Sequence, residues 1–436
     1  MRRYFYKKLR QYLDLYVRPN DRIVEIDAKG SSGLLRFQNH LVLTSTARSG
    51  EARNFEAVRE FRPDYVLLNG NIHYEADIQI FLEDLRKMLW PSVRLIITFY
   101  SNLWRPLLRV ATALGLRSKT PEENWIAPED ARNLLLLAGY ELVREDSKLL
   151  IPAYIPVLSY FANRFLAPLP GFRLFNLLNI VVARPVSQSN SNPGAAAPSV
   201  SVVVPARNEA GNIEAAILRT PAMGPDDELI FIEGNSTDNT WETICQMQQK
   251  YQGTRTIRID RQEGKGKGDA VRKGFALAQK DILMILDADL TVPPEELPRF
   301  YNAIVSNKGE FINGSRLIYP LEKQAMRFFN LLGNKFFSVM FSFILGQRFK
   351  DTLCGTKVLT LENYRKLASH REYFGEFDPF GDFDLIFGAA RMALRIVEVP
   401  VHYRERTYGS TNIERWKHGL ILLRMLGFAA GKIKFI

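Results

Sequence analysis

Short apolar segments alternate with amphipathic segments throughout residues 200–290, and this alternation restricts the possible fold more than any other feature. The apolar segments are nearly continuous, which is typical of strands buried on both faces of a sheet. Strands that alternate with helices form parallel sheets covered by helices on both sides. We therefore predict an α/β, doubly wound arrangement, with strands at 200–205, 228–233, 255–260 and 282–287.

The first part of the chain repeats this alternation, and a segment of different composition separates the two parts. Residues 186–199 carry no charge and are rich in Ser, Asn, Pro, Gly and Ala, which is typical of a linker. We therefore predict two doubly wound domains, 1–185 and 200–436, joined by that linker. In the first domain the strands are expected at 22–26, 40–45, 64–70 and 93–101.

The charge balance favours anionic partners. The chain has 58 Lys and Arg against 47 Asp and Glu, a net charge of +11. Such a balance suits a nucleotide, a phosphorylated lipid, a membrane surface or a nucleic acid. Because the basic residues are dispersed and no base-stacking motif is present, we do not expect nucleic acid. The two cysteines are far apart and the five histidines are scattered, which argues against disulfides and zinc.

Two apolar segments lie among basic residues but are too short to cross a membrane. They are 149–163 and 336–347, whereas a span needs roughly 18 uncharged residues. No signal peptide is expected, because charges interrupt the first residues. Residues 322–349 mix aromatic side chains with arginine and lysine, and 415–436 repeat that mixture. We predict interfacial helices and peripheral membrane attachment, with a buried core helix as the alternative for 322–349.

Two aspartates, Asp287 and Asp289, directly follow the apolar segment "ILMIL". In an extended segment, residues i and i+2 point to the same side, so both carboxylates would converge. Carboxylates that converge repel each other unless a cation lies between them, and Mg²⁺ or Mn²⁺ suits that position. The pair therefore predicts a metal and diphosphate site, with a solvated turn as the simpler alternative.

Polar residues follow the other predicted strands at the same edge, where ligands bind in open α/β sheets. The loop after the first strand contains Pro205, Arg207 and Glu209. In "RQEGKGKGDAVRKGF", Lys265 and Lys267 lie between glycines just before a predicted helix. Glycines allow the backbone to approach a phosphate, and a helix N-terminus and lysines favour its charge.

These motifs, in this order, closely resemble the family 2 glycosyltransferases of GT-A fold. The nearest type is the dolichyl-phosphate mannose/glucose synthases, which transfer a sugar from a nucleotide to a polyprenyl phosphate. The resemblance covers roughly residues 199–415. It implies that "DAD", residues Asp287, Ala288 and Asp289, binds the metal and the diphosphate. It also implies nucleotide or phosphate contacts for Pro205, Arg207, Glu209, Phe231, Glu233, Arg316 and Arg406, in addition to the phosphate contact expected of Lys267 from its own segment.

Departures from the family pattern leave the donor open. Glu233-Gly234 stands where paired aspartates are usual, Thr291 replaces a frequent glutamine, and Asn412 a frequent lysine. The resemblance therefore implies a GDP- or UDP-sugar without choosing between them.

The acceptor also has two interpretations. A sugar hydroxyl must lose a proton as it attacks, which requires a general base, whereas a lipid phosphate is already ionised. Asp382 or Asp384, in the acidic segment 377–387, could be that base or could shape an acceptor groove. We expect metal-dependent, inverting transfer to a polyprenyl phosphate at the cytoplasmic membrane face. Transfer to a sugar or glycan hydroxyl is the alternative.

The first domain resembles a class I S-adenosylmethionine-dependent methyltransferase. Residues 23–35 stand where that family has its glycine-rich cofactor loop, and 127–143 resemble a late helix and strand. Gly30 and Gly33 are present, but residues 27–29 replace the tight glycine cluster. We therefore expect a degenerate structural or docking domain. A bifunctional enzyme that binds S-adenosylmethionine near Asp27 and Asn69 is the alternative.

Overall fold

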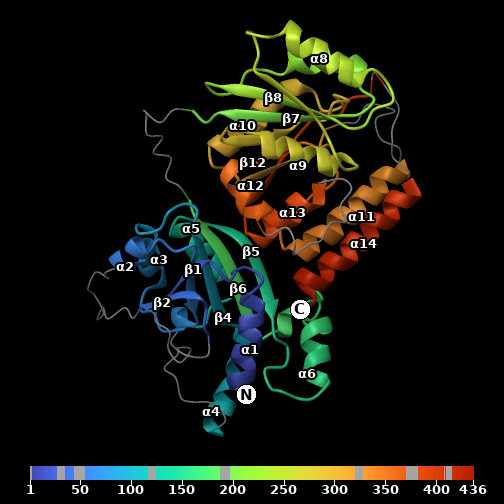
Figure 1. Ribbon diagram of the computed structural model, residues 1–436. Helices are drawn as coiled ribbons and strands as arrows, with labels where there is room; N and C mark the ends of the chain where they lie inside the picture. The colour runs from blue at the N-terminus through green and yellow to red at the C-terminus, as the bar shows by residue number, and fades with distance from the viewer. Residues whose placement is uncertain are drawn as a thin grey trace. The chain divides into compact units, whose positions relative to one another are not determined.

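The computed structural model describes residues 2–26, 35–43, 55–115, 124–186, 197–319, 328–369, 382–406, 408 and 415–436. The chain divides into two compact units, shown in Figure 1. The first comprises Met1–Gln188 together with Ala430–Ile436, and the second comprises Ser189–Ala429. The chain thus leaves the first unit, forms the second, and contributes its last residues to the first. This return was not part of the predicted division.

The first unit is built on a six-stranded sheet of order β2-β1-β3-β4-β6-β5. β1 to β4 are parallel, while β6 is antiparallel to both β4 and β5. The four apolar segments expected as strands form β1 to β4, whereas β6 was not predicted. The strand bounds are β1 (Arg22–Ile26), β2 (Asn39–Leu43), β3 (Tyr65–Asn69), β4 (Arg94–Tyr100), β5 (Tyr140–Lys148) and β6 (Leu178–Pro185).

Helices accompany this sheet, and α3 and α5 contribute buried leucines, phenylalanine and alanine to its core. The α-helices are α1 (Arg2–Leu13), α2 (Glu56–Phe61), α3 (Ile78–Arg86), α4 (Arg105–Ala113), α5 (Pro128–Leu137) and α6 (Leu158–Phe161). Four short helical turns, η1 to η4, are Asn71–His73, Asn102–Trp104, Ala162–Leu166 and Arg173–Phe175.

The C-terminal turn η8 (Ala430–Lys434) contacts β5 of the same unit through ion pairs and a hydrogen bond. The Lys434 ammonium lies 3.1 Å from an Asp146 carboxylate oxygen, and the Lys148 ammonium donates to the Lys434 carbonyl at 2.9 Å. Arg144 also pairs with Asp146, at 2.6 Å. All four side chains are buried. Because unpaired buried charges are costly, these contacts tie the end of the chain to the first unit.

The second unit contains a seven-stranded sheet of order β13-β11-β12-β10-β7-β8-β9. All neighbouring strands are parallel except β12, which is antiparallel to β10 and β11. The α/β prediction is confirmed, but the sheet is mixed. The strands are β7 (Val200–Ala206), β8 (Asp227–Glu233), β9 (Ile257–Arg261), β10 (Ile282–Ile285), β11 (Phe311–Ser315), β12 (Lys357–Thr360) and β13 (Ile396–Pro400).

One core cluster of this unit joins β7, β8 and β10 to helices of the chain, with Val202, Met284 and Phe300 among its buried members. An ideal Cβ on Gly274 of α9 would lie 2.3 Å from a Val203 methyl group, so this glycine allows the helix to approach the sheet closely. The helices are α7 (Ile213–Arg219), α8 (Thr240–Lys250), α9 (Lys267–Leu277), α10 (Leu297–Val305), α11 (Phe328–Leu345), α12 (Leu361–Ala368), α13 (Asp382–Arg391) and α14 (Arg415–Ala429), with turns η5 (Ala210–Asn212) and η6 (Pro294–Glu296).

The segment predicted as an interfacial helix forms α11, and one side of it is buried in the unit. The Phe341 ring lies 5.1 Å from that of Phe383 and 5.5 Å from that of Phe387, both on α13. Phe336 and Val339 remain exposed. A core helix therefore describes much of α11 better than a wholly interfacial one. Within the described residues, no helix has both the length and the apolar character to cross a membrane.

Candidate active site

The loops that follow β7, β8 and β10 lie at one edge of the second sheet, because these strands are parallel neighbours. Ala206 at the end of β7 is aligned with Glu233 at the end of β8. Pro205 belongs to β7, and Arg207 follows it with an exposed side chain. The predicted edge thus carries the segments after Ala206, Glu233 and Ile285.

The "DAD" residues form a turn rather than an extended segment. β10 ends at Ile285, and the Leu290 amide donates to the Asp287 carbonyl at 3.0 Å. Leu290 itself has a φ of 52°. The expectation of an extended i, i+2 arrangement is therefore wrong, because the chain turns at the edge of the sheet. The Ala288 side chain is buried in the core cluster.

Asp287 pairs with Lys267, the first residue of α9, with its Oδ1 atom 2.5 Å from the ammonium nitrogen. Burial by itself raises the pKa of Asp287, but the charge of Lys267, followed by those of Lys357 and Arg316, outweighs it and lowers that pKa. Gly266 precedes Lys267 with a φ of 85°, a conformation that favours glycine. The carboxylate is therefore held ionised.

Gly355 provides the space for this pair. An ideal Cβ at this position would lie 2.0 Å from Asp287 Oδ2 and 2.4 Å from the Lys267 ammonium nitrogen. Any side chain on residue 355 would displace both groups. The glycine in "DTLCGTKV" therefore forms part of the site.

Asp289 belongs to a second ionic network that joins segments far apart in the sequence. Arg406 donates to Asp289 Oδ2 at 2.6 Å and to Glu209 Oε1 at 3.2 Å. The Thr291 hydroxyl and amide both donate to Asp289 Oδ1, at 2.9 and 3.1 Å. Asn212 donates to Glu209 Oε2 at 2.7 Å. Arg406 thus connects the loop after β7 to the "DAD" turn.

The pKa of Glu209 is raised, chiefly because the side chain is largely buried, although the hydrogen bond from Asn212 and the charge of Arg406 act in the opposite direction. A carboxyl group with a raised pKa depends on its cationic partner to remain ionised. Removal of Arg406 from Glu209 is therefore expected to favour the protonated acid.

Two asparagines that the sequence analysis missed shape the neighbouring loops. Asn208 and Asn235 have φ values of 57° and 58°, in the left-handed region that asparagine tolerates better than most residues. The Thr237 amide donates to Asn208 Oδ1 at 2.8 Å, and the Asn208 amide donates to the Ser236 hydroxyl at 3.0 Å. These bonds join the loops after β7 and β8. The only sequence signal was an asparagine two or three residues after a predicted strand.

The two predicted residues of β8 behave differently. Glu233 accepts a hydrogen bond from the Ser236 amide at 2.5 Å and lies 3.8 Å from Arg261. Phe231 is only 1% exposed and belongs to the core cluster. A direct nucleotide contact through the Phe231 side chain is therefore wrong, because strand alternation directs that ring into the core.

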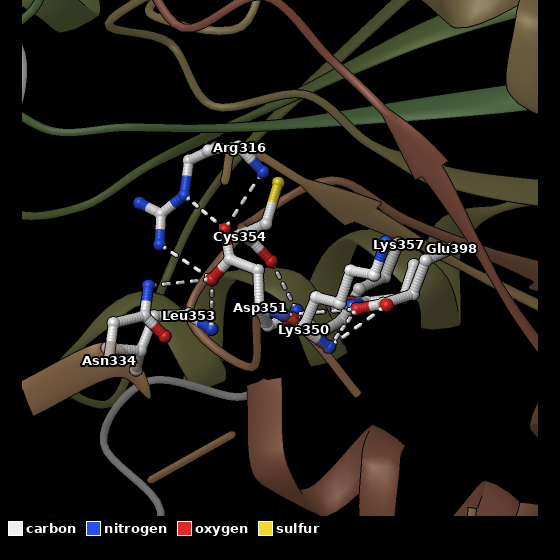
Figure 2. Close-up of polar contacts among 9 residues, drawn as sticks. Arg316, Asn334, Lys350, Asp351, Leu353, Cys354, Lys357 and Glu398 are labelled. Carbon is white, nitrogen blue, oxygen red and sulfur yellow. Dashed lines mark hydrogen bonds and ion pairs between the residues drawn. The ribbon is translucent and has the colours of Figure 1, made fainter. Parts of the chain in front are cut away.

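Arg316 is held in a buried cluster around Asp351 (Figure 2). Its guanidinium donates to Asp351 Oδ2 at 2.7 Å and to Oδ1 at 2.9 Å. Asn334 and the Leu353 amide each donate to Oδ1 at 3.0 Å. Asp351 is 0% exposed. The arginine expected near the sugar phosphate therefore makes a bidentate interaction with a carboxylate of the protein itself.

The electrostatics of this cluster match its geometry. Burial by itself raises the pKa of Asp351, but Arg316 and Asn334 outweigh it and hold that pKa at about 2. Burial also raises the pKa of the neighbouring Cys354 thiol to about 11. Glu398 accepts hydrogen bonds from the backbone amides of Lys350 and Asp351, at 2.9 and 3.1 Å. The cluster, drawn in Figure 2, thus organises the chain before Gly355.

The acidic segment proposed for the acceptor is described only in part. Asp382 begins α13, and its side chain lies outside the described residues. Asp384 Oδ2 lies 3.9 Å from an Arg272 nitrogen of α9. An ion pair at this distance does not assign a function to Asp384, so its role stays a prediction. Lys265, in the glycine-rich loop, is exposed.

A divalent ion would have Asp287 and Asp289 as its protein ligands. Within the described ranges, no group of three or more His, Cys, Asp or Glu side chains is placed to hold a metal. Two carboxylates suit Mg²⁺ or Mn²⁺, which commonly complete their coordination with water and substrate phosphates. Both carboxylates are partly exposed and already face a cationic group, and the space beside Gly355 accommodates Asp287. The donor set is therefore compatible with such an ion.

Residues 201–364 match the family described as "Glycosyl transferase family 2". Over 121 residues, the chain is 36% identical to a dolichol-phosphate mannosyltransferase of Pyrococcus furiosus, covering 27% of this chain and 33% of that protein. Over 232 residues, it is 27% identical to an undecaprenyl-phosphate 4-deoxy-4-formamido-L-arabinose transferase of Edwardsiella ictaluri, covering 51% and 64%. The matched region thus spans less than two thirds of either relative.

Residues 201–364 of the second unit thus match the family 2 glycosyltransferase model, which supports the resemblance inferred from the motifs over those residues. A crystal structure of a Mycobacterium tuberculosis glucosyl-3-phosphoglycerate synthase with Mn²⁺, UDP-glucose and glycerol 3-phosphate is also similar. It has 20% identity, a TM-score of 0.41, and coverage of 55% of this chain and 81% of that one. Similarity this low carries no information about the site.

The methyltransferase resemblance of the first unit stays a prediction. Asp27, Gly30 and Gly33 lie outside the described residues. Asn69 is the last residue of β3, and its Oδ1 atom accepts a hydrogen bond from the Thr98 hydroxyl at 2.8 Å. This contact joins β3 to β4.

Proposed function

We propose that the second unit is a metal-dependent, inverting glycosyltransferase that moves a sugar from a UDP- or GDP-sugar to a polyprenyl phosphate. The observation that carries this proposal is the set of ion pairs at the edge of the sheet, Asp287 with Lys267 and Asp289 with Arg406. Two carboxylates and two cationic side chains at one edge of the sheet suit a metal–diphosphate group, because the carboxylates can bind the positive metal and the cations can bind the negative diphosphate. The names of the two relatives support the acceptor.

Donor binding would exchange partners in these pairs. Asp287 and Asp289 would hold Mg²⁺ or Mn²⁺, and the ion would neutralise the diphosphate as a leaving group. Lys267 and Arg406, released from the carboxylates, would then bind diphosphate oxygens. Lys267 lies in the first turn of α9, where backbone N–H groups and the helix dipole also favour an anion.

The acceptor phosphate supplies its own negative charge. One of its oxygens would attack the anomeric carbon from the side opposite the leaving nucleoside diphosphate, so the configuration inverts. The new C–O bond forms as the bond to the diphosphate breaks, and no proton is transferred. A general base is therefore unnecessary, which is consistent with an Asp384 that faces Arg272.

Transfer to a sugar or glycan hydroxyl is the second candidate. It would require Asp384 or Asp382 to accept the proton of the attacking hydroxyl. Asp384 is only 12% exposed at its side chain, so it would also need to separate from Arg272. S-Adenosylmethionine binding by the first unit is not part of this proposal.

Nucleotide release by the purified full chain tests the proposal. The reaction is measured across UDP- and GDP-sugars, with Mg²⁺ or Mn²⁺, each with and without a short polyprenyl phosphate. We expect release that requires the metal and the lipid phosphate and that Asp289→Ala abolishes. Glu362→Gln, at an exposed ion pair with Lys366 on α12, is the matched control and should retain activity.

Other outcomes would distinguish the alternatives. In one such outcome, nucleotide release is independent of the lipid phosphate, depends on an added sugar and is abolished by Asp384→Asn. That result would contradict the polyprenyl-phosphate acceptor and support transfer to a hydroxyl group. No release with any donor, from a chain that folds normally, would contradict a nucleotide-sugar transferase of either kind.

A further inference from the structure

A helix in the first unit presents an exposed apolar face. Four apolar side chains, Leu103, Leu107, Val110 and Leu114, follow one another at intervals of four, three and four residues along η2 and α4. Each is between 56% and 68% exposed, and α4 has no buried residue. A helix this short is not stable on its own in water and normally requires a surface that covers its apolar face.

A second exposed apolar segment adjoins this helix. Between residues 154 and 175, side chains that are more than half exposed include Tyr154, Val157, Leu158, Phe161, Leu174 and Phe175. The indole nitrogen of Trp104 donates to the Phe175 carbonyl at 2.8 Å, which places η2 beside η4. In Figure 1, α4 and α6 lie at the same end of the first unit. We refer to residues 103–114 and 154–175 together as the apolar end.

The start of α1 borders the same end. The Tyr4 ring lies 5.7 Å from that of Tyr154, and Asn163 donates to the Tyr4 hydroxyl at 3.1 Å. The pKa of Lys8 is lowered first by burial and then by the charge of Arg164. Lys8 of α1 therefore lies near Arg164, which belongs to the apolar end. The basic and apolar residues are therefore neighbours in space.

The segments that form and border the apolar end carry charges of one sign. Residues 2–13, 101–115 and 149–186 contain no Asp or Glu. The basic residues of these segments include Arg105 and Arg109 on α4, and Arg164 and Arg173 in the second segment. A surface that is both apolar and basic is complementary to an anionic lipid bilayer, with apolar side chains among the acyl chains and cations at the headgroups. Two copies of this surface would repel each other.

We propose that the apolar end is a membrane-binding surface, which makes the first unit an anchor for the chain on an anionic bilayer. The proposal is independent of the reaction assigned to the second unit. It also differs from the expectation that residues 322–349 and 415–436 supply the interfacial helices, because one side of α11 is buried against α13.

Vesicle binding by the full chain tests the proposal. Co-sedimentation is measured with vesicles of phosphatidylcholine alone and of phosphatidylcholine mixed with phosphatidylglycerol. We expect binding to the anionic vesicles that weakens with salt, and a loss of roughly tenfold or more in the partition coefficient of the double variant Leu107→Glu/Val110→Glu. These positions are exposed, so the substitutions should leave the fold intact.

Two controls use equally exposed apolar residues elsewhere. Leu136→Glu changes a 70% exposed residue of α5 in the same unit, and Val339→Glu changes a 67% exposed residue of α11. Both should bind vesicles nearly as well as the unchanged chain. Loss of binding in Val339→Glu but not in the double variant would overturn the proposal, because the second unit would then be the anchor.

A second measurement does not depend on loss of binding. An environment-sensitive dye is attached at Leu107→Cys in a Cys245→Ser chain, where the remaining Cys354 is buried. Its emission should shift to shorter wavelength when anionic vesicles are added. An unchanged spectrum would overturn the proposal. So would a stable dimer in solution that the double variant dissociates, because the occupant would then be a second copy of the chain.

Discussion

Asp351 and the Asp287–Asp289 turn combine carboxylates with cationic side chains in the same unit, but they differ in how completely the protein encloses them. Asp351 accepts five hydrogen bonds, three of them from Arg316, and is 0% exposed. The side chains of Asp287 and Asp289 are 28% and 17% exposed. The full enclosure of Asp351 leaves none of its lone pairs for a ligand. The partial exposure of Asp287 and Asp289 leaves these two carboxylates able to exchange their cationic partners for a ligand. Geometry, rather than residue type, separates a structural ion pair from a candidate site.

The largest expected effect is on the stability of the enclosed cluster. Asp351→Ala should lower the free energy of unfolding by about 3–5 kcal/mol, because it leaves the Arg316 guanidinium buried without its partner. Urea denaturation followed by circular dichroism measures this. Arg316→Met/Asp351→Leu, which removes both charges, should lose much less. Equal losses in the single and double variants would show that packing, not the unpaired charge, sets the cost.

The partly exposed ion pair of Asp287 with Lys267, the open pair, should matter more for activity than for stability. Asp287→Asn should reduce transferase turnover by roughly a hundredfold or more, because a ligand of the proposed metal and diphosphate site is lost. Its free energy of unfolding should change by less than about 1 kcal/mol, since both partners are partly exposed. Steady-state kinetics and urea denaturation of the same preparation measure the two effects. A large loss of stability would remove the contrast with Asp351.

Acid should weaken the enclosed cluster around Asp351. The pKa of Asp351 is about 2 in the folded protein, against an ordinary value of 3.8. A depressed pKa contributes stability that is complete above the ordinary value and is lost as pH falls through the folded one. About 2 kcal/mol should therefore disappear between about pH 4 and pH 2. In Asp351→Asn the stability curve should be flatter over this window, and an unchanged curve would contradict the assignment.

The smallest expected effect concerns the space beside the open pair. Gly355→Ala should reduce turnover by about tenfold, because the new Cβ displaces Asp287 and Lys267, with a stability loss of about 1 kcal/mol. Gly314→Ala is the control, since its Cβ would meet Cys354 Sγ at 2.4 Å instead. That variant should lose stability at least as much while retaining more activity. The reverse pattern would indicate that Gly355 serves packing alone.

Much of the second sheet could be predicted from the sequence because its signals are local. The strands expected at 200–205 and 228–233 occur as Val200–Ala206 and Asp227–Glu233. Continuous apolar segments bounded by polar residues carry that information without reference to the rest of the chain. The antiparallel strand β12 could not be predicted in this way, because strand direction depends on the path of the intervening chain.

The candidate site was predicted in composition but not in its pairings. Glu209, Lys267, Asp287 and Asp289 were all singled out, and the structure places them in the ionic networks at one edge of the sheet. Arg316 was assigned to the same site, and its charge does lower the pKa of Asp287, but its guanidinium is paired with Asp351. The sequence supplies the number and sign of the charges at a sheet edge. It does not supply the distances that decide which charges neutralise each other.

The sequence by itself determined the α/β architecture of both parts, the basic character and the family 2 motifs, because each depends on residue types at short spacing. Only the tertiary structure decided which distant residues meet. Arg406 contacts Glu209 across 197 positions, and Lys434 contacts Asp146 across 288. It also decided that α4 has no buried residue while one side of α11 is covered. Burial and ion pairing are properties of the folded chain, since they depend on which surfaces the remaining residues cover.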